Sequence, residues 1–534
     1  MRRGDLARGA AGIALATAAS RITGFLRVVV VAATLGTTFL ANVYQTANTA
    51  PNLLFELMAA GVLTSVFVPT FVSLLVRGRG EESSWEVPNA LMWVALVALI
   101  ALGVVLGLGA PLIMRLLTLG VEDPALRAEE IQLGTALLRL FSPQIVFYGA
   151  GMIMTAALHA HRKFLLPALA PIANNFVVIA VYLTYASLRG SRAPELEGIS
   201  TGETFLLGAG TTVGVIAMTA VLLPQLRRLG WRWRWVWRPR DPEVRRGLRI
   251  GIWGLGYAGG YQAGLIVVLL LANKLEGGVA AYQWAYTFFY LPHALIGIAI
   301  FNVLFTAMSE HAARDELRQV SARVRDGLRM LCFLLLPVAA LLVVASDAIT
   351  SAALDYGAMS AGNTVLIGRV LAAFALGLPG YSAFLFLTRA FYAVGEARTP
   401  ALVNATTVAA ASGLGVLLFF QAPSGWEVAG LAAAHSIAFS LGAFVLGLRL
   451  PLRGVIATGP ELSRALARSL IGSVGAAAAG ILVRMAMDAD SRTGVFLELA
   501  GAAAAMGLVY MAGMALARSP EMARLRGLLG RAGG

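Results

Sequence analysis

The sequence predicts an all-α integral membrane protein with about 14 transmembrane helices. Of its 534 residues, 58% are hydrophobic and only 13% are charged, a balance that is not typical of a water-soluble chain of this size. The apolar runs are about twenty or more residues long, as membrane-spanning helices require, whereas the strands of a membrane barrel alternate over about ten. The fold class is therefore helical, with lipid as the surrounding solvent.

Fourteen apolar runs are separated by charged residues, glycines or prolines. The spans that they predict lie near residues 11–36, 41–76, 88–114, 131–158, 165–187, 204–226, 247–273, 278–307, 327–349, 362–393, 399–420, 427–448, 465–487 and 495–517.

Lysine and arginine gather on alternate connections between these runs. The N-terminal arginines, the segments 227–249 and 314–329 and the C-terminal tail are basic, whereas the intervening loops carry no comparable excess. Because cytoplasmic loops retain basic residues, this alternation predicts an even number of spans and a multi-pass cell-membrane protein with both termini in the cytoplasm. Orientation in the membrane thereby accounts for the net charge of +14, and we expect no nucleic-acid partner.

A weak internal repeat divides the chain. The tripeptide Pro-Ala-Leu opens a span at Pro167 and again at Pro400, and a proline interrupts the preceding span each time, at Pro143 and Pro379. Repeated halves with interrupted helices are typical of transporters that work by alternating access. The predicted organisation is an N-terminal six-helix half (1–230), a basic Trp/Arg cytoplasmic linker (231–246), a second six-helix half (247–450) and a C-terminal helix pair with a basic tail (451–534).

Arg21 and Arg27 lie well inside the first span. An arginine at the centre of a membrane helix costs about 2.5–3.5 kcal/mol on insertion scales, so it usually faces a wet cavity or a partner. Six positions separate the two residues by about 120° around a helix, so they share one face only if the helix loosens at Gly24. We therefore expect an irregular first helix that borders a wide cationic cavity; the alternative is that the side chains snorkel to the interface.

Polar residues also form a stripe on the second span and recur at steps of three or four: Asn42, Gln45, Asn48, Asn52 and Glu56. We expect this stripe to face the arginines, with Glu56 pairing with one of them; the alternative is polar contact between helices. Pro51 interrupts this span and Pro292 interrupts the eighth, so these two prolines and Gly24 are the predicted helix hinges. Further ionisable residues inside predicted spans are Arg139, Arg389, His293, His435, Arg484 and Glu498.

The segment 231–240, WRWRWVWRPR, alternates tryptophan with arginine. Interleaved aromatic and basic residues can stack on single-stranded nucleic acid, but two predicted spans closely bracket this segment. We therefore expect it to anchor the protein to anionic membrane lipids.

Motifs of enzymes are absent from the sequence, which has no Walker loop, HExxH motif or nucleophile elbow. We therefore predict a protein that is not an enzyme, with no catalytic residue, metal or cofactor.

Three segments resemble a known family: SRITGFLRVVVVAATLG (20–36), APNLLFELMAAGVLTSVFVPTF (50–71) and FSPQIVFYGAGMIMTAALHAHRKFLLPALAPIANN (141–175). They are similar to the MurJ/MviN family of lipid II flippases, within the multidrug/oligosaccharidyl-lipid/polysaccharide exporter superfamily, and look closest to actinobacterial members. The resemblance implies a 14-helix bacterial membrane protein that moves lipid II, the undecaprenyl-diphosphate-linked peptidoglycan precursor, from the inner to the outer leaflet. It also implies that Arg21 and Arg27 bind the substrate, and we add Asn42, Asn52 and Glu56 to the predicted binding residues.

Several charges of that family are replaced in this chain. Val28 and Asn42 stand where the family often has acids, and Phe55 and Thr287 fall at or near positions of basic residues. The span 399–420 has no carboxylate, which argues against the sodium site of some members. We therefore expect the membrane potential, rather than a sodium gradient, to drive the cycle.

Two other functions stay open from the sequence. A related exporter of polysaccharide lipids or drugs would share the fold and the repeat but would lack the S-R-x-x-G-F-x-R element of residues 20–27. A non-transporting scaffold for cell-wall synthesis would tolerate neutral replacement of both arginines. The expected partners are lipid II and anionic membrane lipids, and contact with cell-wall synthesis proteins stays open.

Overall fold

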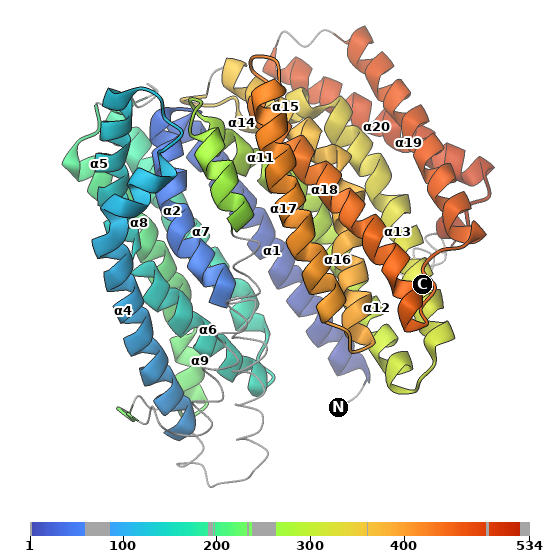
Figure 1. Cartoon of the computed structure of the whole chain (residues 1–534), viewed down its shortest axis with the longest axis horizontal. Coiled ribbons are helices and arrows are strands. Elements are labelled where there is room, and N and C mark those ends of the chain that lie inside the picture. The colour runs from blue at the N-terminus through green and yellow to red at the C-terminus, as the bar shows by residue number, and fades with distance from the viewer. Residues whose placement is uncertain are drawn as a thin grey trace. The chain divides into compact units, whose positions relative to one another are not determined.

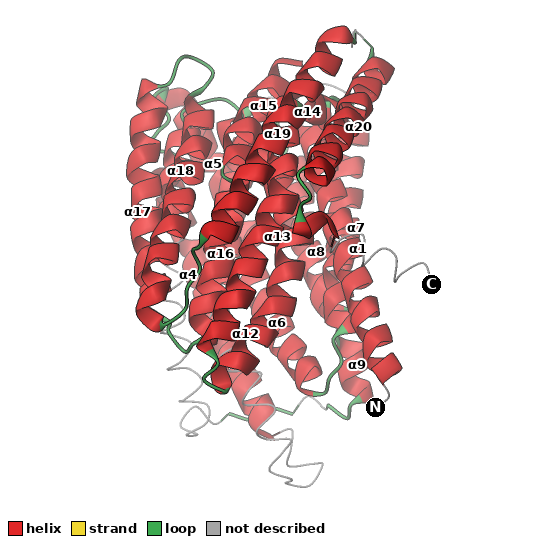
Figure 2. Ribbon diagram, turned by 90° about the vertical axis from the view of Figure 1, so that its right-hand side faces the viewer, coloured by secondary structure: helices red, strands yellow, loops and turns green. Residues whose placement is uncertain are grey.

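The computed structural model describes residues 3–58, 86–190, 196, 198–231, 234–237, 263–359, 361–487 and 491–523 of the chain. Within these ranges the regular elements are all helical and no strand occurs (Figure 2). The chain divides into two compact units, one of Met1–Ala280 with Tyr356–Met359 and the other of Ala281–Asp355 with Ser360–Gly534. The predicted all-α membrane fold class is thus confirmed.

The predicted spans agree with the helices. Among the described residues, 11 helices are long and apolar enough to cross a membrane, or 12 if the bent pair Gly362–Leu376 and Leu378–Ala393 is one span. These 12 fall on predicted spans. The remaining two predictions, 41–76 and 247–273, are only partly described, by Phe39–Met58 and Ala263–Ala272. The number 14 therefore stays a prediction.

Eight labelled helices belong to the first unit (Figure 1): α1 (Arg3–Leu35), α2 (Phe39–Met58), α4 (Glu86–Leu117), α5 (Pro124–Phe141), α6 (Gln144–Ala160), α7 (Leu165–Arg189), α8 (Thr201–Ala220) and α9 (Leu223–Arg228). Asp123 caps α5 by accepting a hydrogen bond from the Ala125 amide at 2.8 Å, and Pro124 suits the first helical turn because it needs no N–H there. α5 ends before Pro143, which interrupts the span as predicted. The span α5–α6 is the most buried among the described ones, because 72% of the residues in its most apolar stretch lie inside the protein.

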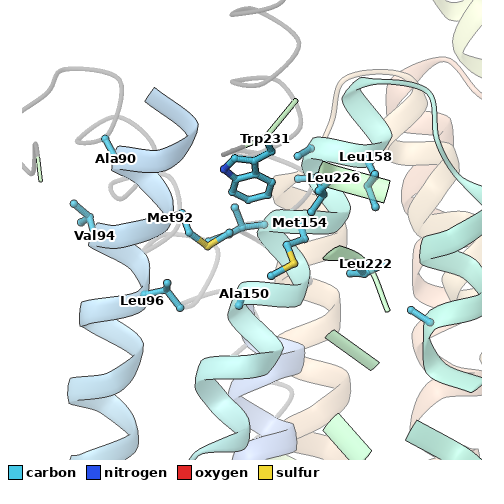
Figure 3. Close-up of a cluster of buried hydrophobic side chains, with 14 residues drawn as sticks. Ala90, Met92, Val94, Leu96, Ala150, Met154, Leu158, Leu222, Leu226 and Trp231 are labelled. Atoms are coloured by element: carbon cyan, nitrogen blue, oxygen red, sulfur yellow. The ribbon is translucent and has the colours of Figure 1, made fainter. Parts of the chain in front are cut away.

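A buried apolar cluster joins α4, α6 and α9 (Figure 3). In it the Trp231 ring lies near Met92 and Met154, and its indole N–H donates to Asn89 Oδ1 at 2.9 Å. Trp93 donates to the Arg234 carbonyl at 2.8 Å. These contacts hold the described start of the predicted linker 231–246 against α4. Most of that linker lies outside the described residues, so the predicted division into two six-helix halves stays a prediction.

The second unit contains most of α11 (Gly278–Pro292) and the elements that follow it: η3 (His293–Gly297), α12 (Ile298–Ala313), α13 (Leu317–Val344), α14 (Ser346–Leu354), α15 (Ala361–Leu376), α16 (Leu378–Ala393), α17 (Arg398–Gln421), α18 (Glu427–Arg449), η4 (Leu450–Arg453), α19 (Pro460–Ala486) and α20 (Arg492–Leu516). α15 and α16 form the bent pair, with an angle of 47°. Gly377 lies at the bend against α18, where an added Cβ would stand 2.5 Å from the Ser436 Cα. A glycine is therefore needed for this approach.

The C-terminal helices α19 and α20 run side by side and pack on α13 (Figure 1). Gly472 and Gly480 of α19 leave space that Met514 and Met506 of α20 fill, which is the close packing that small residues allow between membrane helices. The Tyr510 hydroxyl donates to the Phe333 carbonyl of α13 at 2.6 Å. This pair is thus a packed part of the second unit.

Candidate functional site

α1 carries both predicted substrate-binding arginines. It is one continuous helix through Gly24, so the expected irregularity is not found in this structure. A Cβ at Gly24 would meet only the Asn175 amide nitrogen at 3.6 Å, and nothing there forces a break. Because the helix stays regular, the two arginines point to different faces: Arg21 is exposed, whereas Arg27 is half-buried. A hinge at Gly24 stays a prediction.

α7 fixes the part of α1 beside these arginines. The buried Asn175 of α7 donates from Nδ2 to Thr23 Oγ1 at 3.0 Å and to the Ser20 carbonyl at 3.4 Å. No sequence pattern marks Asn175 as a functional residue, although it lies in the third segment of the family resemblance. It holds α1 in position at Ser20 and Thr23, on either side of Arg21.

A buried tyrosine pair lies within electrostatic reach of Arg27. The Tyr44 hydroxyl of α2 and Thr211 Oγ1 of α8 are 2.7 Å apart and hydrogen-bonded, and the Tyr44 and Tyr182 rings meet edge-on at 5.6 Å. The Arg27 charge acts on the hydroxyl groups of both tyrosines. Within the described residues, Arg27 forms no ion pair or side-chain hydrogen bond. It is a cation with polar neighbours but no counter-ion there.

Asn42 is fully buried at the start of α2. Its Nδ2 donates to the Leu275 carbonyl at 2.8 Å, and its Oδ1 accepts from the Val279 and Ala280 amides at 3.1 and 3.4 Å. In this structure Asn42 therefore caps the first turn of α11, and its amide is occupied by backbone rather than open to a cavity. The partners are more than 230 residues away in sequence, so the stripe pattern gave no sign of this role.

The other predicted residues of α2 lie further along the same helix. Asn52 is half-buried and accepts a hydrogen bond from the Tyr148 hydroxyl of α6 at 2.9 Å. The buried Pro51 does not interrupt the helix, which continues to Met58. The side chain of Glu56 lies outside the described part of the structure, so its pairing with an arginine stays a prediction.

Pro292 marks a real irregularity in the eighth predicted span. α11 ends at this proline and a π-helical turn, His293–Gly297, precedes α12. His293 in that turn is buried, and its Nδ1 lies 2.9 Å from Ser382 Oγ of α16. Proline and π-turns are common causes of kinks, and π-turns often mark functional sites. Hinge motion at Pro292 itself stays a prediction.

Arg484 of α19 has quite different surroundings from Arg27. Its Nε donates to Glu498 Oε1 at 2.5 Å, its Nη2 donates to Asp347 Oδ2 at 2.7 Å, and it also donates to the Val344 carbonyl. The sequence placed Arg484 and Glu498 inside membrane spans but gave no pairing. This cluster ties α19 and α20 to the end of α13 and the start of α14.

Arg27 suits an anionic ligand. A guanidinium presents planar hydrogen-bond donors that match phosphate and carboxylate oxygens. A cation without a partner in a membrane helix is costly and usually faces a cavity or a ligand. Within the described residues, no group of three or more histidines, cysteines and acids could hold a metal ion.

Known proteins match this chain over most of its length. The family model of the lipid II flippase MurJ matches residues 31–501. A probable lipid II flippase MurJ of Rhizobium tropici is 29% identical over 502 residues, covering 94% of this chain and 91% of the relative. The lipid II flippase MurJ of Burkholderia cenocepacia is 26% identical and covers 83% of each chain.

Solved structures share the fold. A lipid II flippase MurJ in an inward closed conformation matches with a TM-score of 0.75 at 20% identity, covering 94% of this chain and 98% of that one. An inward-facing multidrug resistance transporter of the MATE family and MOP superfamily matches with a TM-score of 0.66 at 13% identity, covering 85% and 98%. The fold is thus shared with both of these solved structures. The chain belongs to the lipid II flippase MurJ family.

Proposed function

We propose that this protein moves lipid II from the inner to the outer leaflet of the bacterial cell membrane by alternating access. The observation that carries the proposal is the family match over residues 31–501. The relatives that span most of this chain are named as lipid II flippases, which favours this substrate over drugs or other lipid-linked sugars. The protein is a transporter and not an enzyme.

The chemistry of the substrate explains what the protein must provide. A diphosphate headgroup crossing about 30 Å of hydrocarbon meets the same barrier as any buried ion. A flippase therefore needs a hydrated cationic cavity that opens to one leaflet at a time. In our proposal Arg27 binds the diphosphate, and Arg21, Asn52 and Glu56 contribute to the same cavity in at least one conformation.

The proposal also assigns orientation and secondary partners. Both termini are cytoplasmic, as the loop charges favour. The basic Trp/Arg segment contacts anionic lipid headgroups, an assignment that is supported by the exposure of Trp235 and Trp237, whose rings stack at 6.1 Å.

Depletion of the protein tests the function directly. Lipid II should accumulate in the inner leaflet of depleted cells and return to the outer leaflet when the wild-type gene is restored. A lipid II distribution that does not change on depletion would contradict flipping and favour a scaffold. Accumulation of a different lipid-linked sugar instead would favour a related exporter.

A further inference from the structure

Glu130 of α5 is a carboxylate buried without a partner. Its side chain is fully buried, and neither carboxylate oxygen has a hydrogen-bond partner. Two other glutamates among the described residues are buried, Glu498 and Glu521, and each accepts a hydrogen bond from an arginine. Glu130 is the exception in this set.

Charged groups on the helices packed around Glu130 do not pair with its carboxylate. α5 contacts α2, α4 and α8. The charged or titratable groups on these four helices, within the described side chains, are Tyr44 of α2, Arg115 of α4, Glu203 of α8, and Arg127, Glu129 and Arg139 of α5 itself. None of them forms an ion pair or hydrogen bond with Glu130.

The nearest arginines in the sequence are engaged elsewhere. Arg127 donates to the Arg115 carbonyl at 3.2 Å, and Arg139 donates to the Gly107 carbonyl at 3.4 Å. Across the loop before α5, Lys274 pairs with Glu122 at 2.9 Å. A negative charge on Glu130 would therefore be both desolvated and uncompensated, which costs several kcal/mol or more.

Two cations could neutralise such a group, a proton or a metal ion. A sodium or calcium ion needs several oxygen ligands around it, and among the described residues no group of three or more histidines, cysteines and acids could hold a metal ion. A proton needs only the carboxylate itself. The surroundings of Glu130 thus favour a proton over a metal ion.

We propose that Glu130 is a proton-binding site of the first unit, occupied in this conformation and emptied when the outer end of α5 opens to water. Glu130 lies six residues after Pro124, the first residue of α5, which is about 9 Å along the helix axis. The loop before α5 carries the exposed acids Glu122 and Asp123, and the predicted topology places it outside the cell. A small displacement of this helix end would give the carboxyl access to water, where the charged form is stable.

The site makes the conformational equilibrium depend on external pH. Acid outside favours the conformation in which Glu130 is buried and protonated, and a less acidic exterior favours the opened one. The site itself follows from burial alone, whereas its link to lipid II flipping rests on the proposed function.

The matched variants for the test are Glu130→Gln and Glu129→Gln. Glutamine has the shape of a protonated glutamic acid but cannot titrate, and Glu129 is the half-buried neighbour on the same helix. Infrared spectra of the purified protein, recorded across a pH titration, should show a protonated-carboxyl band in wild type and in Glu129→Gln that Glu130→Gln lacks. An identical band in all three proteins would overturn the proposal.

Thermal unfolding provides a second measurement. Because burial favours the protonated form, the melting temperature of wild type should fall as the pH rises above the ordinary range of carboxyl titration, and it should fall less in Glu130→Gln. If that variant fails to fold, the wild-type titration decides, and a melting temperature that does not fall with rising pH contradicts the proposal.

Flipping of lipid II in vesicles, at zero membrane potential, tests the functional link. The rate for wild type and Glu129→Gln should change when the outer pH is lowered, and the rate for Glu130→Gln should not. A wild-type rate that does not change with outer pH, or a Glu130→Gln rate that changes as the wild-type rate does, would overturn the link between Glu130 and flipping. Absence of flipping by all three proteins would instead contradict the proposed function, and the infrared result would still decide on proton binding.

Discussion

Arg484 of α19 and Arg27 of α1 are both arginines within membrane helices, yet their surroundings are opposite. Arg484 is held by Glu498, by Asp347 and by a backbone carbonyl, whereas Arg27 has neither an ion pair nor a side-chain hydrogen bond in the described part of the chain. Removing one member of a buried ion pair is destabilising, because it leaves the charge of the other member buried and uncompensated. An unpaired charge within a membrane helix is itself costly and remains free to bind an anion.

The largest expected difference between the two is in stability. Arg484→Ala leaves the buried Glu498 without its partner, and we expect the free energy of unfolding to fall by about 3 kcal/mol. Arg27→Ala should not lower it, because an arginine without a counter-ion in a membrane helix is itself costly. Unfolding of the purified proteins in the same detergent measures both, and an equal loss of stability would contradict the comparison.

A second substitution sharpens the assignment of Arg484. If the cost of Arg484→Ala is the uncompensated carboxylate, then adding Glu498→Gln to it should recover about 1–2 kcal/mol. The double-mutant cycle uses wild type, both single variants and the double variant. Additive effects of the two substitutions would show that the 2.5 Å contact between these side chains carries no coupling.

The smallest expected effect is on the way the stability of the fold depends on pH. Burial alone would raise the pKa of Asp347, which lies beyond the end of α13, but the hydrogen bond and charge of Arg484 hold that pKa below its ordinary value. The charged form is therefore favoured in the folded state, so its contribution is complete above about pH 4 and is lost as the pH falls through the lowered pKa.

Asp347→Asn removes this contribution. The wild-type melting temperature should fall more steeply below about pH 4 than that of the variant. The difference should correspond to less than about 1 kcal/mol, because the Asp347 side chain is 55% exposed. Parallel acid titrations of the two proteins would contradict the stated role of Asp347.

The sequence predicted the helices better than the roles of individual polar residues. Hydrophobic length places a span without knowledge of its neighbours, and so α4, α17 and α18 fall close to the predicted residues. Asn42 looked like part of a binding stripe because its spacing fits one, yet its partners lie in the loop before α11 and in the first turn of α11. The pairing of Arg484 with Asp347 joins residues 137 apart, and no local pattern reports such a contact.

The predicted irregularity of α1 shows a different limit. The prediction assumed that Arg21 and Arg27 must share one face, but α1 remains regular and presents them on two faces. Hydrogen bonds from Asn175 to α1 support this regular form. In this conformation the helix geometry separates the two arginines, and their shared cavity stays part of the proposed function.

Flipping of lipid II per folded molecule tests the central claim most directly. Wild type, Arg27→Ala, Arg27→Lys and Arg484→Ala would be reconstituted in vesicles, and the rates would be divided by the amount of folded protein. We predict a loss of about tenfold or more for Arg27→Ala, because a charge-assisted hydrogen bond contributes about 1.5–3 kcal/mol. Arg27→Lys should be intermediate, since lysine keeps the charge without the planar donors, and Arg484→Ala should stay near the wild-type rate. A wild-type rate for Arg27→Ala would contradict the assignment of Arg27 as the anion-binding residue.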